Sequence, residues 1–144
     1  ESRVMQVEHR TLVQTPPETI FKIYEDVANW HTWDPDTKQA SLDGPLRVGA
    51  RGRLTPTKGR TVPMQVTDVV VGRSFTVESK IPLFRMVFEH ELNPEQAGTE
   101  VVHRVTFSGL LSLVLGPMLS KQLNVGLPIT LGKLKLLAQS TVAA

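Results

Sequence analysis

The chain has 144 residues, of which 40% are hydrophobic and 21% charged, and its formal net charge is +2. Such a length and composition are typical of one globular domain with a sizeable core, so we expect a single domain over residues 1–144. The sequence has no cysteine, which excludes disulfides, thiolate metal ligands and thiol catalysis. The small net charge and the lack of a recognition-helix motif predict no nucleic-acid partner.

The longest uncharged run, residues 105–120, contains two glycines and a proline and is shorter than the ~20 apolar residues that a membrane span needs. We therefore expect no stable membrane insertion. No signal peptide is visible near Glu1, which makes the cytoplasm the expected location. The sequence predicts no cofactor, and it leaves both a monomer and a homodimer open.

The chain begins with a predicted strand, followed by a short helix. Residues 3–14 alternate between an apolar and a polar face, with His9 on the apolar side, which is typical of a half-buried strand. Thr15, with Glu18 three residues later, resembles a capping box, so we expect a helix over 17–25 with Thr15 as its N-cap. The side chains expected to face inward from this helix are Ile20, Phe21 and Tyr24.

Residues 26–33 predict a second short helix, and the rest of the chain up to residue 107 alternates between strand patterns and turns rich in glycine and proline. The six strands expected there are 39–42, 50–56, 62–71, 74–81, 83–92 and 99–107. Short turns between strands imply antiparallel neighbours, and the separation of helices from strands predicts an α+β fold.

The last part of the chain, from 108 to 144, predicts one long helix or two halves of one. Apolar residues three or four apart indicate a buried face, made of Leu119, Leu123, Leu127, Leu131, Leu134 and Ala138. We expect a second apolar set to widen this face so that the helix rests in a concavity: Leu115, Met118, Val125, Ile129 and Leu136. Pro128 removes an amide donor beside Gly126, which predicts a kink near 126–128.

This order of elements resembles the helix-grip fold of the START-like (SRPBCC) superfamily, which includes plant pollen-allergen proteins and bacterial polyketide cyclase/dehydrase and lipid-transport proteins. The segments that carry the resemblance are Pro17-Glu18-Thr19-Ile20-Phe21, Asp26-Val27-Ala28-Asn29-Trp30 with Trp33 and Pro35, Phe88-Glu89-His90-Glu91-Leu92, Gly98-Thr99-Glu100-Val101 and Leu127-Pro128. The resemblance implies a seven-stranded curved antiparallel sheet around the long kinked C-terminal helix, with two short helices after the first strand. It also implies an internal cavity for an apolar or aromatic ligand.

Three of the four histidines are expected to point into this cavity. His90 and His103 lie on the inward faces of their strands, because Glu89 and Glu91 take the solvent side. In the resembling fold their strands adjoin the first one, which carries His9. Three interpretations stay open for these histidines: polar groups of a half-wet pocket wall, a zinc site with one open position, or a general base, with His90 and His103 as candidates.

Trp30 and Trp33 are three residues apart and so share a helix face. They are expected either to anchor the packing or to form a wall of the cavity mouth. Their neighbours His31 and Asp34 are expected at the surface.

Two further polar residues are candidates for ligand contact. In aromatase/cyclase relatives a strand arginine reaches into the pocket to hold a substrate oxygen, and Arg53 is the matching residue that the resemblance implies here, with a possible catalytic role. Asn124, just before the predicted kink, either bonds a ligand or takes solvent.

The expected ligand wall is otherwise apolar and consists of Phe84, Met86, Phe88, Val105, Phe107, Leu123 and Leu127. A mostly apolar lining with a few convergent polar groups is typical of ligand pockets. The function expected is therefore the binding or carrying of a small hydrophobic molecule, aromatic, polyketide-like or lipid. Two alternatives are a polyketide cyclase/aromatase that uses the same cavity and a membrane-contacting transfer protein in which residues 110–119 open over the bilayer.

Overall fold

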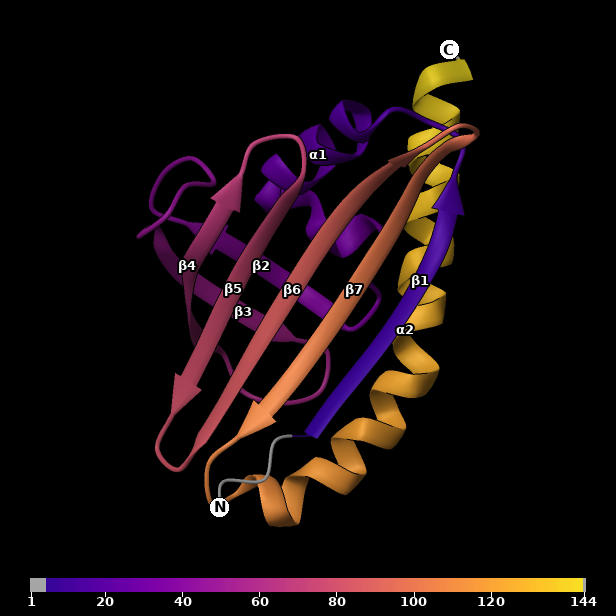
Figure 1. The fold of residues 1–144 in the computed structure, drawn as a ribbon. Helices are drawn as coiled ribbons and strands as arrows, with labels where there is room; N and C mark the ends of the chain where they lie inside the picture. Colours follow the sequence, from indigo (N-terminus) through magenta and orange to yellow (C-terminus); the bar gives the residue numbers. More distant parts are fainter. Residues whose placement is uncertain (1–4, 144) are drawn as a thin grey trace.

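The computed structural model of the protein describes residues 5–143, with side chains placed up to residue 141. The chain forms one curved sheet with three helical elements (Figure 1). Their bounds are β1 Met5–Val13, α1 Pro17–Glu25, η1 Val27–Thr32 (a 3-10 helix), β2 Thr37–Leu42, β3 Arg51–Pro56, β4 Val62–Val70, β5 Ser74–Ile81, β6 Phe84–Glu95, β7 Gly98–Ser108 and α2 Ser112–Ala143. The predicted elements are confirmed, most of them to within two residues.

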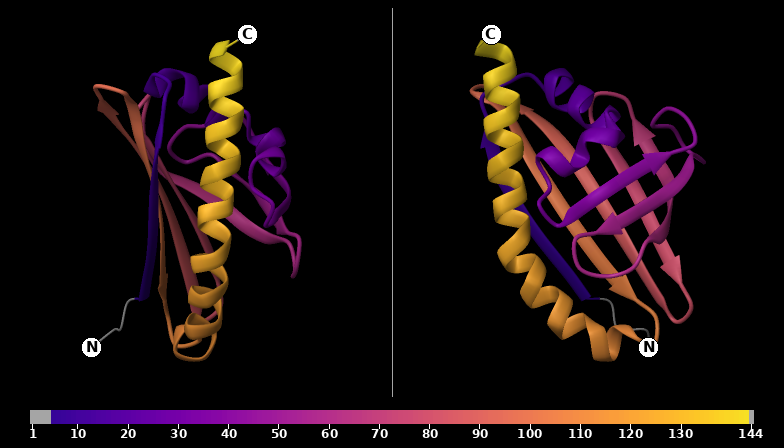
Figure 2. Two further views of the ribbon diagram at one scale, coloured as in Figure 1. Left: turned by 90° about the vertical axis from the view of Figure 1, so that its right-hand side faces the viewer. Right: turned by 180° about the vertical axis from the view of Figure 1, so that it is seen from behind.

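The seven strands follow the order β1-β7-β6-β5-β4-β3-β2, and every neighbouring pair is antiparallel. Register shifts between Thr37 and Gln39 and between Val66 and Asp68 mark irregularities that increase the local twist and bending of the sheet. α1 and η1 lie over one end of its inner face, while α2 runs along β1 (Figure 2). The predicted helix-grip α+β architecture is thus confirmed.

One capping detail differs from the prediction. The residue that precedes the first turn of α1 is Pro16, and no side chain caps the helix there. Thr15 is buried instead, and its backbone carbonyl accepts a 2.7 Å hydrogen bond from the Thr99 hydroxyl. Thr15 therefore ties β1 to β7 rather than capping α1.

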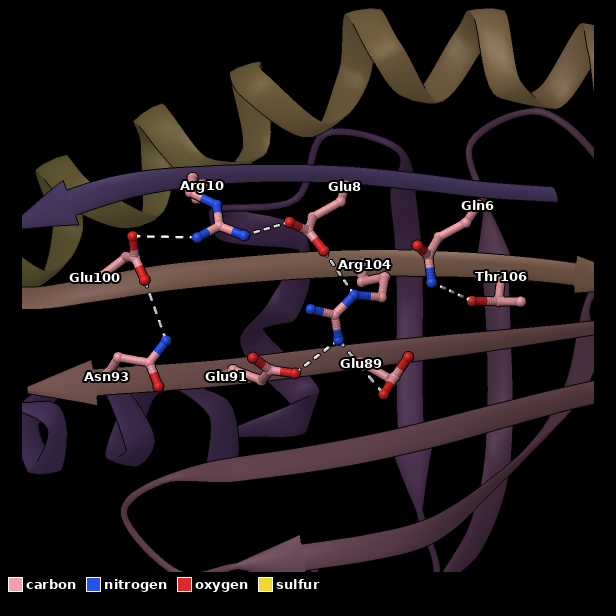
Figure 3. Close-up of polar contacts among 9 residues, drawn as sticks. All are labelled: Gln6, Glu8, Arg10, Glu89, Glu91, Asn93, Glu100, Arg104 and Thr106. Atoms are coloured by element: carbon pink, nitrogen blue, oxygen red, sulfur yellow. Dashed lines mark hydrogen bonds and ion pairs between the residues drawn. The ribbon is translucent and has the colours of Figure 1, made fainter.

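The outer face of the sheet carries an ion-pair network centred on Arg104 (Figure 3). Its guanidinium lies 2.7 Å from Glu8, 2.6 Å from Glu91 and 3.6 Å from Glu89. Hydrogen bonds to Glu91 and Glu8 raise the pKa of Arg104, and hydrogen bonds from Arg10 and Arg104 lower the pKa of Glu8. The glutamates predicted to face outward on β6 do so, which leaves the inner face to apolar side chains and histidines.

The C-terminal helix continues through both Pro117 and Pro128 and is bent along its length, as Figure 2 shows. The predicted inner stripe is confirmed, since Leu127, Leu131, Leu134 and Ala138 are buried and Leu119 and Leu123 are half-buried. Among the described residues, no helix is long and apolar enough to cross a membrane.

The second apolar set of this helix was expected to be buried, and that prediction is wrong. Leu115 is half-buried, but the other four members are exposed: Met118 by 52%, Val125 by 65%, Ile129 by 49% and Leu136 by 70%. The physical reason is that α2 lies along the β1 edge of the sheet, where it has a neighbour on one side only.

The tight turn between β6 and β7 generates a prediction about stability. Gly98 has a φ of +143°, and a Cβ atom there would lie 2.1 Å from the carbonyl oxygen of Val13. Gly98→Ala should therefore lower the free energy of unfolding by roughly 2 kcal/mol. Gly132 lies in an exposed part of α2 with open space around it, so Gly132→Ala should raise stability by about 0.5–1 kcal/mol.

Urea denaturation of the two variants and of the wild type measures both effects. A Gly98→Ala protein as stable as the wild type would show that the backbone at this turn adapts without cost.

Candidate functional site

Three histidines stand side by side on the inner face of the sheet, and we call them the histidine row. The register pairs His9 of β1 with His103 of β7, and His103 with His90 of β6. Residues directly opposite one another on neighbouring strands share a face, so the three imidazoles point to the same side. The ring centroids of His90 and His103 are 4.7 Å apart. The histidines were predicted to point to one side of the sheet, and the strand order brings them together there.

Each imidazole of the row has its own polar partner. The Tyr24 hydroxyl lies 2.8 Å from His103 Nε2, His90 Nδ1 lies 3.2 Å from the carbonyl oxygen of Phe75, and His9 Nε2 lies 2.8 Å from Asn124 Oδ1. A carbonyl oxygen only accepts hydrogen bonds, so His90 Nδ1 and His9 Nε2 are the donors. A neutral His90 then keeps an unprotonated Nε2.

Burial controls the protonation of two imidazoles of the row, those of His90 and His103. It lowers the pKa of His90 from 6.5 to about 4, although the hydrogen bond to Phe75 acts in the opposite direction. It lowers the pKa of His103 well below 6.5, and the neighbouring His90 lowers it further. Burial also raises the pKa of the Tyr24 hydroxyl. The side chains of His90, His103 and Tyr24 are therefore uncharged at neutral pH.

The zinc interpretation of the histidine row does not fit this geometry. The rings of His9, His90 and His103 each point a nitrogen at a different partner, and no group of three His, Cys, Asp or Glu side chains within residues 5–143 is arranged to hold a metal ion. The polar-wall interpretation and the general-base interpretation both remain compatible with the contacts.

The histidine row lies between two groups of apolar side chains, which differ in how completely they are closed. The α1–η1 cluster contains 19 buried hydrophobic residues, contributed mainly by α1, η1, the sheet and the second half of α2. The β6–α2 cluster lies at the other end and includes five buried residues, but eight further members are only partly buried. One end of the interior is thus closed, and the other is open in part.

All seven predicted wall residues belong to the β6–α2 cluster. Four of them are buried core residues of the cluster and lie on β6 and β7 or on α2: Phe84, Val105, Phe107 and Leu127. Met86, Phe88 and Leu123 are partly exposed although they face inward. These three side chains leave apolar surface of the inner face in contact with solvent, and we call this incompletely covered surface between β6 and α2 the trough.

The two tryptophans do not join this wall. Trp30 is buried in the α1–η1 cluster, where it packs against Phe75 and donates from Nε1 to the carbonyl oxygen of Tyr24 over 2.9 Å. Of the two interpretations of Trp30, packing is the one that these contacts describe, because η1 turns the side chain into the closed end. Trp33 is also buried, but its ring centroid lies 6.2 Å from that of His103, and its Nε1 is without a partner among the described residues.

Arg53 is excluded from the interior by its position in β3. The register places it opposite Ser41 and Pro63, while its neighbours Gly52 and Leu54 take the inner face opposite the buried Met64 and the half-buried Val62. Arg53 is therefore exposed on the outer face, and its expected pocket and catalytic roles are wrong. Strand alternation around Leu54 already favoured this orientation.

The sequence analysis missed the contacts of two residues of the site, Tyr24 and Asp34. Tyr24 was placed on the inward face of its helix, but its hydrogen bond to His103 depends on a contact between α1 and β7. Asp34, expected at the surface, is largely enclosed: it accepts hydrogen bonds from Thr37, the Asp36 amide and Thr130 of α2, and burial raises its pKa.

Two hollows lie on the surface of the molecule. One, of about 320 Å³, is lined by residues of β4, β5, β6 and the β4–β5 turn, among them Asp68, Arg73 and Glu91. The other, of about 370 Å³, lies between the β1–α1 connection and the β6–β7 turn. Of the predicted site residues only His90 borders either hollow, so the trough beside β6 and α2 is the better match to the expected ligand wall.

A family model described as polyketide cyclase/dehydrase and lipid transport matches residues 5–139. No curated protein sequence matches the chain significantly. Among solved structures, a protein of unknown function from Staphylococcus aureus is 14% identical over 100% of this chain and 99% of its own, with a TM-score of 0.75.

Two enzymes of known name share the fold. The di-domain ARO/CYC StfQ from the steffimycin biosynthetic pathway is 12% identical with a TM-score of 0.80, and the match covers 98% of this chain and 52% of StfQ. Norcoclaurine synthase from Thalictrum flavum is 11% identical with a TM-score of 0.73, over 96% and 88% of the two chains. At such identities the structural matches establish the fold alone.

The buried histidines predict how stability depends on pH. Because the folded state lowers the pKa of His90 from 6.5 to about 4, the unfolded chain binds more protons between these values, and stability falls as the pH falls through this range. The slope for one such histidine approaches about 1.4 kcal/mol per pH unit. Urea denaturation between neutral pH and the folded pKa should show this loss.

The double variant His90→Gln, His103→Gln should have a flatter pH profile, whereas a His31→Gln control, changed at an exposed histidine, should keep the wild-type slope. An unchanged slope in the double variant would show that other groups control the acid sensitivity.

Proposed function

Because the chain belongs to the polyketide cyclase/dehydrase and lipid transport family, within the START-like superfamily, we propose that it binds a small hydrophobic molecule between the sheet and α2. The ligand would lie in the trough of the β6–α2 cluster, with one end at the histidine row.

The observation that carries this proposal is the incomplete burial of the β6–α2 cluster. Met86, Phe88, Leu119 and Leu123 face the interior from two sides and are all partly exposed. Covering apolar surface is favourable by roughly 25 cal/mol per Å², so an apolar guest in contact with these side chains gains affinity from them.

The polar end of the trough indicates what kind of ligand fits. His90 and His103 are neutral and Arg53 lies on the outer face, so none of these three compensates the charge of a carboxylate or phosphate on the guest. His90 Nε2 is an acceptor, which suits a hydroxyl or another hydrogen-bond donor on the guest. The proposed ligand is therefore uncharged, mainly apolar or aromatic, and carries at least one donor.

A second candidate function is catalysis of the cyclase/aromatase type. It is favoured by the unprotonated Nε2 of His90 next to an apolar trough and by the likeness in fold to the ARO/CYC protein StfQ. His90 would take a proton from a carbon between two carbonyl groups, the resulting enolate would attack a second carbonyl of the same chain, and the imidazolium would return the proton to the new alkoxide. The trough would hold the chain folded for this step.

The binding proposal predicts that Phe88→Asp weakens binding of N-phenyl-1-naphthylamine, an uncharged aromatic probe whose fluorescence rises in apolar surroundings. A carboxylate in the trough must be desolvated when the probe enters, so the dissociation constant should rise at least about tenfold. Fluorescence titration measures it.

The matched control is Val71→Asp, a change from valine to aspartate at a residue that is 79% exposed in the β4–β5 turn, and it should bind the probe like the wild type. Circular dichroism establishes that both variants are folded. A folded Phe88→Asp protein with wild-type affinity would remove the trough from consideration.

The catalytic alternative predicts saturable cyclisation of a synthetic poly-β-ketone chain by the wild type. The rate should drop by about 10²-fold or more in His90→Ala, while N-phenyl-1-naphthylamine still binds. The cyclic alcohol formed in this step becomes aromatic by loss of water and enolisation of the ring ketones, so product formation is followed by the absorbance of the new aromatic ring. If the wild type binds the chain and releases it unchanged, the protein acts as a carrier and the alternative is rejected.

A further inference from the structure

The outward side of α2 carries an unusual run of exposed apolar side chains. Of the large hydrophobic residues that are exposed among those described, more than half belong to α2 or to the loop just before it. Five of them recur at intervals of four and seven and form what we call the outer stripe: Val114, Met118, Val125, Ile129 and Leu136. At 3.6 residues per turn they share one face, opposite the buried stripe.

The charges beside the outer stripe are all of one sign. The segment from Ser108 to Ala144 contains no aspartate or glutamate, and its charged residues are Lys121, Lys133 and Lys135. Helical geometry puts Lys121 and Lys135 on one flank of the stripe and Lys133 on the other. No carboxylate within the described residues pairs with these lysines.

Carboxylates gather instead on the outer face of the sheet. Glu8, Glu89, Glu91 and Glu100 surround Arg10 and Arg104 there (Figure 3). This network therefore has two more carboxylates than guanidiniums, while α2 carries only positive charges. A negatively charged partner surface would be attracted to α2 and not to this network, which favours docking through α2.

From these observations we propose that α2 lies flat on an anionic phospholipid bilayer, with the outer stripe in the interfacial region and the three lysines at the level of the headgroups. An apolar stripe flanked by lysines is the pattern that interfacial helices use. Lys side chains of this length reach the phosphate level from the edges of such a stripe.

A second copy of the chain is a poorer match for the same surface. Two outer stripes packed against each other would bring the lysines of both helices together, with no carboxylate on either helix to pair with them. Helix pairs of that kind rely on opposite charges along their flanks. A lipid surface offers both hydrocarbon and negative charge.

The docking surface adjoins the trough at the start of α2. Leu111, Leu115 and Leu119 belong to the β6–α2 cluster and occupy the same turns as Val114 and Met118. The amide of Leu111 also donates to the carbonyl oxygen of Leu83, which brings the exposed Leu83 of the β5–β6 turn next to this end. If the trough holds the ligand as proposed above, docking places its open end at the bilayer.

Vesicle flotation at low ionic strength tests the proposal. The protein should bind vesicles of phosphatidylcholine with about a third phosphatidylserine, and bind vesicles of phosphatidylcholine alone at least about tenfold more weakly. Changing Lys121, Lys133 and Lys135 to Gln together should lower the affinity for the anionic vesicles about 100-fold, since each lysine near the surface contributes roughly fivefold.

The stripe variant Met118→Gln, Val125→Gln, Ile129→Gln should lose vesicle binding. Its matched control, Val48→Gln, Val70→Gln, Val71→Gln, removes three equally exposed valines elsewhere and should bind like the wild type. The stripe variant should also keep its affinity for N-phenyl-1-naphthylamine without vesicles, so a failure of docking is distinguished from a failure of the trough.

Three results would overturn the proposal: no binding to anionic vesicles, equal binding to neutral ones, or vesicle binding that survives in the stripe variant. A stable dimer in sedimentation equilibrium that the stripe variant dissociates would assign the surface to a second copy and overturn it as well.

Discussion

The alignment of β1, β7 and β6 is the constraint on which the interior depends. It places three imidazoles in one row across the inner face, and burying such groups is costly unless they are neutral and hydrogen-bonded. His90 and His103 meet both conditions, with the carbonyl of Phe75 and Tyr24 as their partners, and His9 is hydrogen-bonded to Asn124. The row divides the apolar interior into a closed end, packed by the aromatic residues of α1 and η1, and an end that stays partly open.

Three polar contacts, spaced along α2, hold this helix in position. Asn124 meets His9, Thr130 donates to Asp34, and Gln139 accepts from the amide of Gln14. These contacts hold the helix against β1 and the end of η1. Both sides of the helix are apolar, yet only one of them has a protein neighbour. A helix with two apolar faces and one protein neighbour leaves the other face uncovered, and this is the face that the docking proposal assigns to a bilayer.

Local periodicity was enough to predict the strands, the helices and the inward faces of β6 and β7, because each of these depends on nearest neighbours in the chain. The strand order that brings the three histidines into one row came from the resembling fold, and the structure has the same order. The errors concern Arg53, Thr15, Asp34 and the second apolar set of the long helix. Arg53 was carried over from relatives against its own strand alternation. The other three depend on how the helices dock and on the contact between Thr15 and β7, which no local pattern determines.

The two proposals, ligand binding in the trough and docking of α2 on a bilayer, place different demands on the site. A bilayer is as apolar as the trough, so burial of hydrocarbon alone does not favour the protein over the membrane. What would distinguish the two environments under this proposal is the polar end, where a hydrogen-bond donor on the ligand would meet the lone pair of His90 Nε2. Selectivity for a ligand that comes from a membrane would then arise at the histidine row, while the half-open apolar walls would supply access. Met86, Phe88 and Leu123 are the incompletely covered side chains that such access requires, and they lie next to the histidine row.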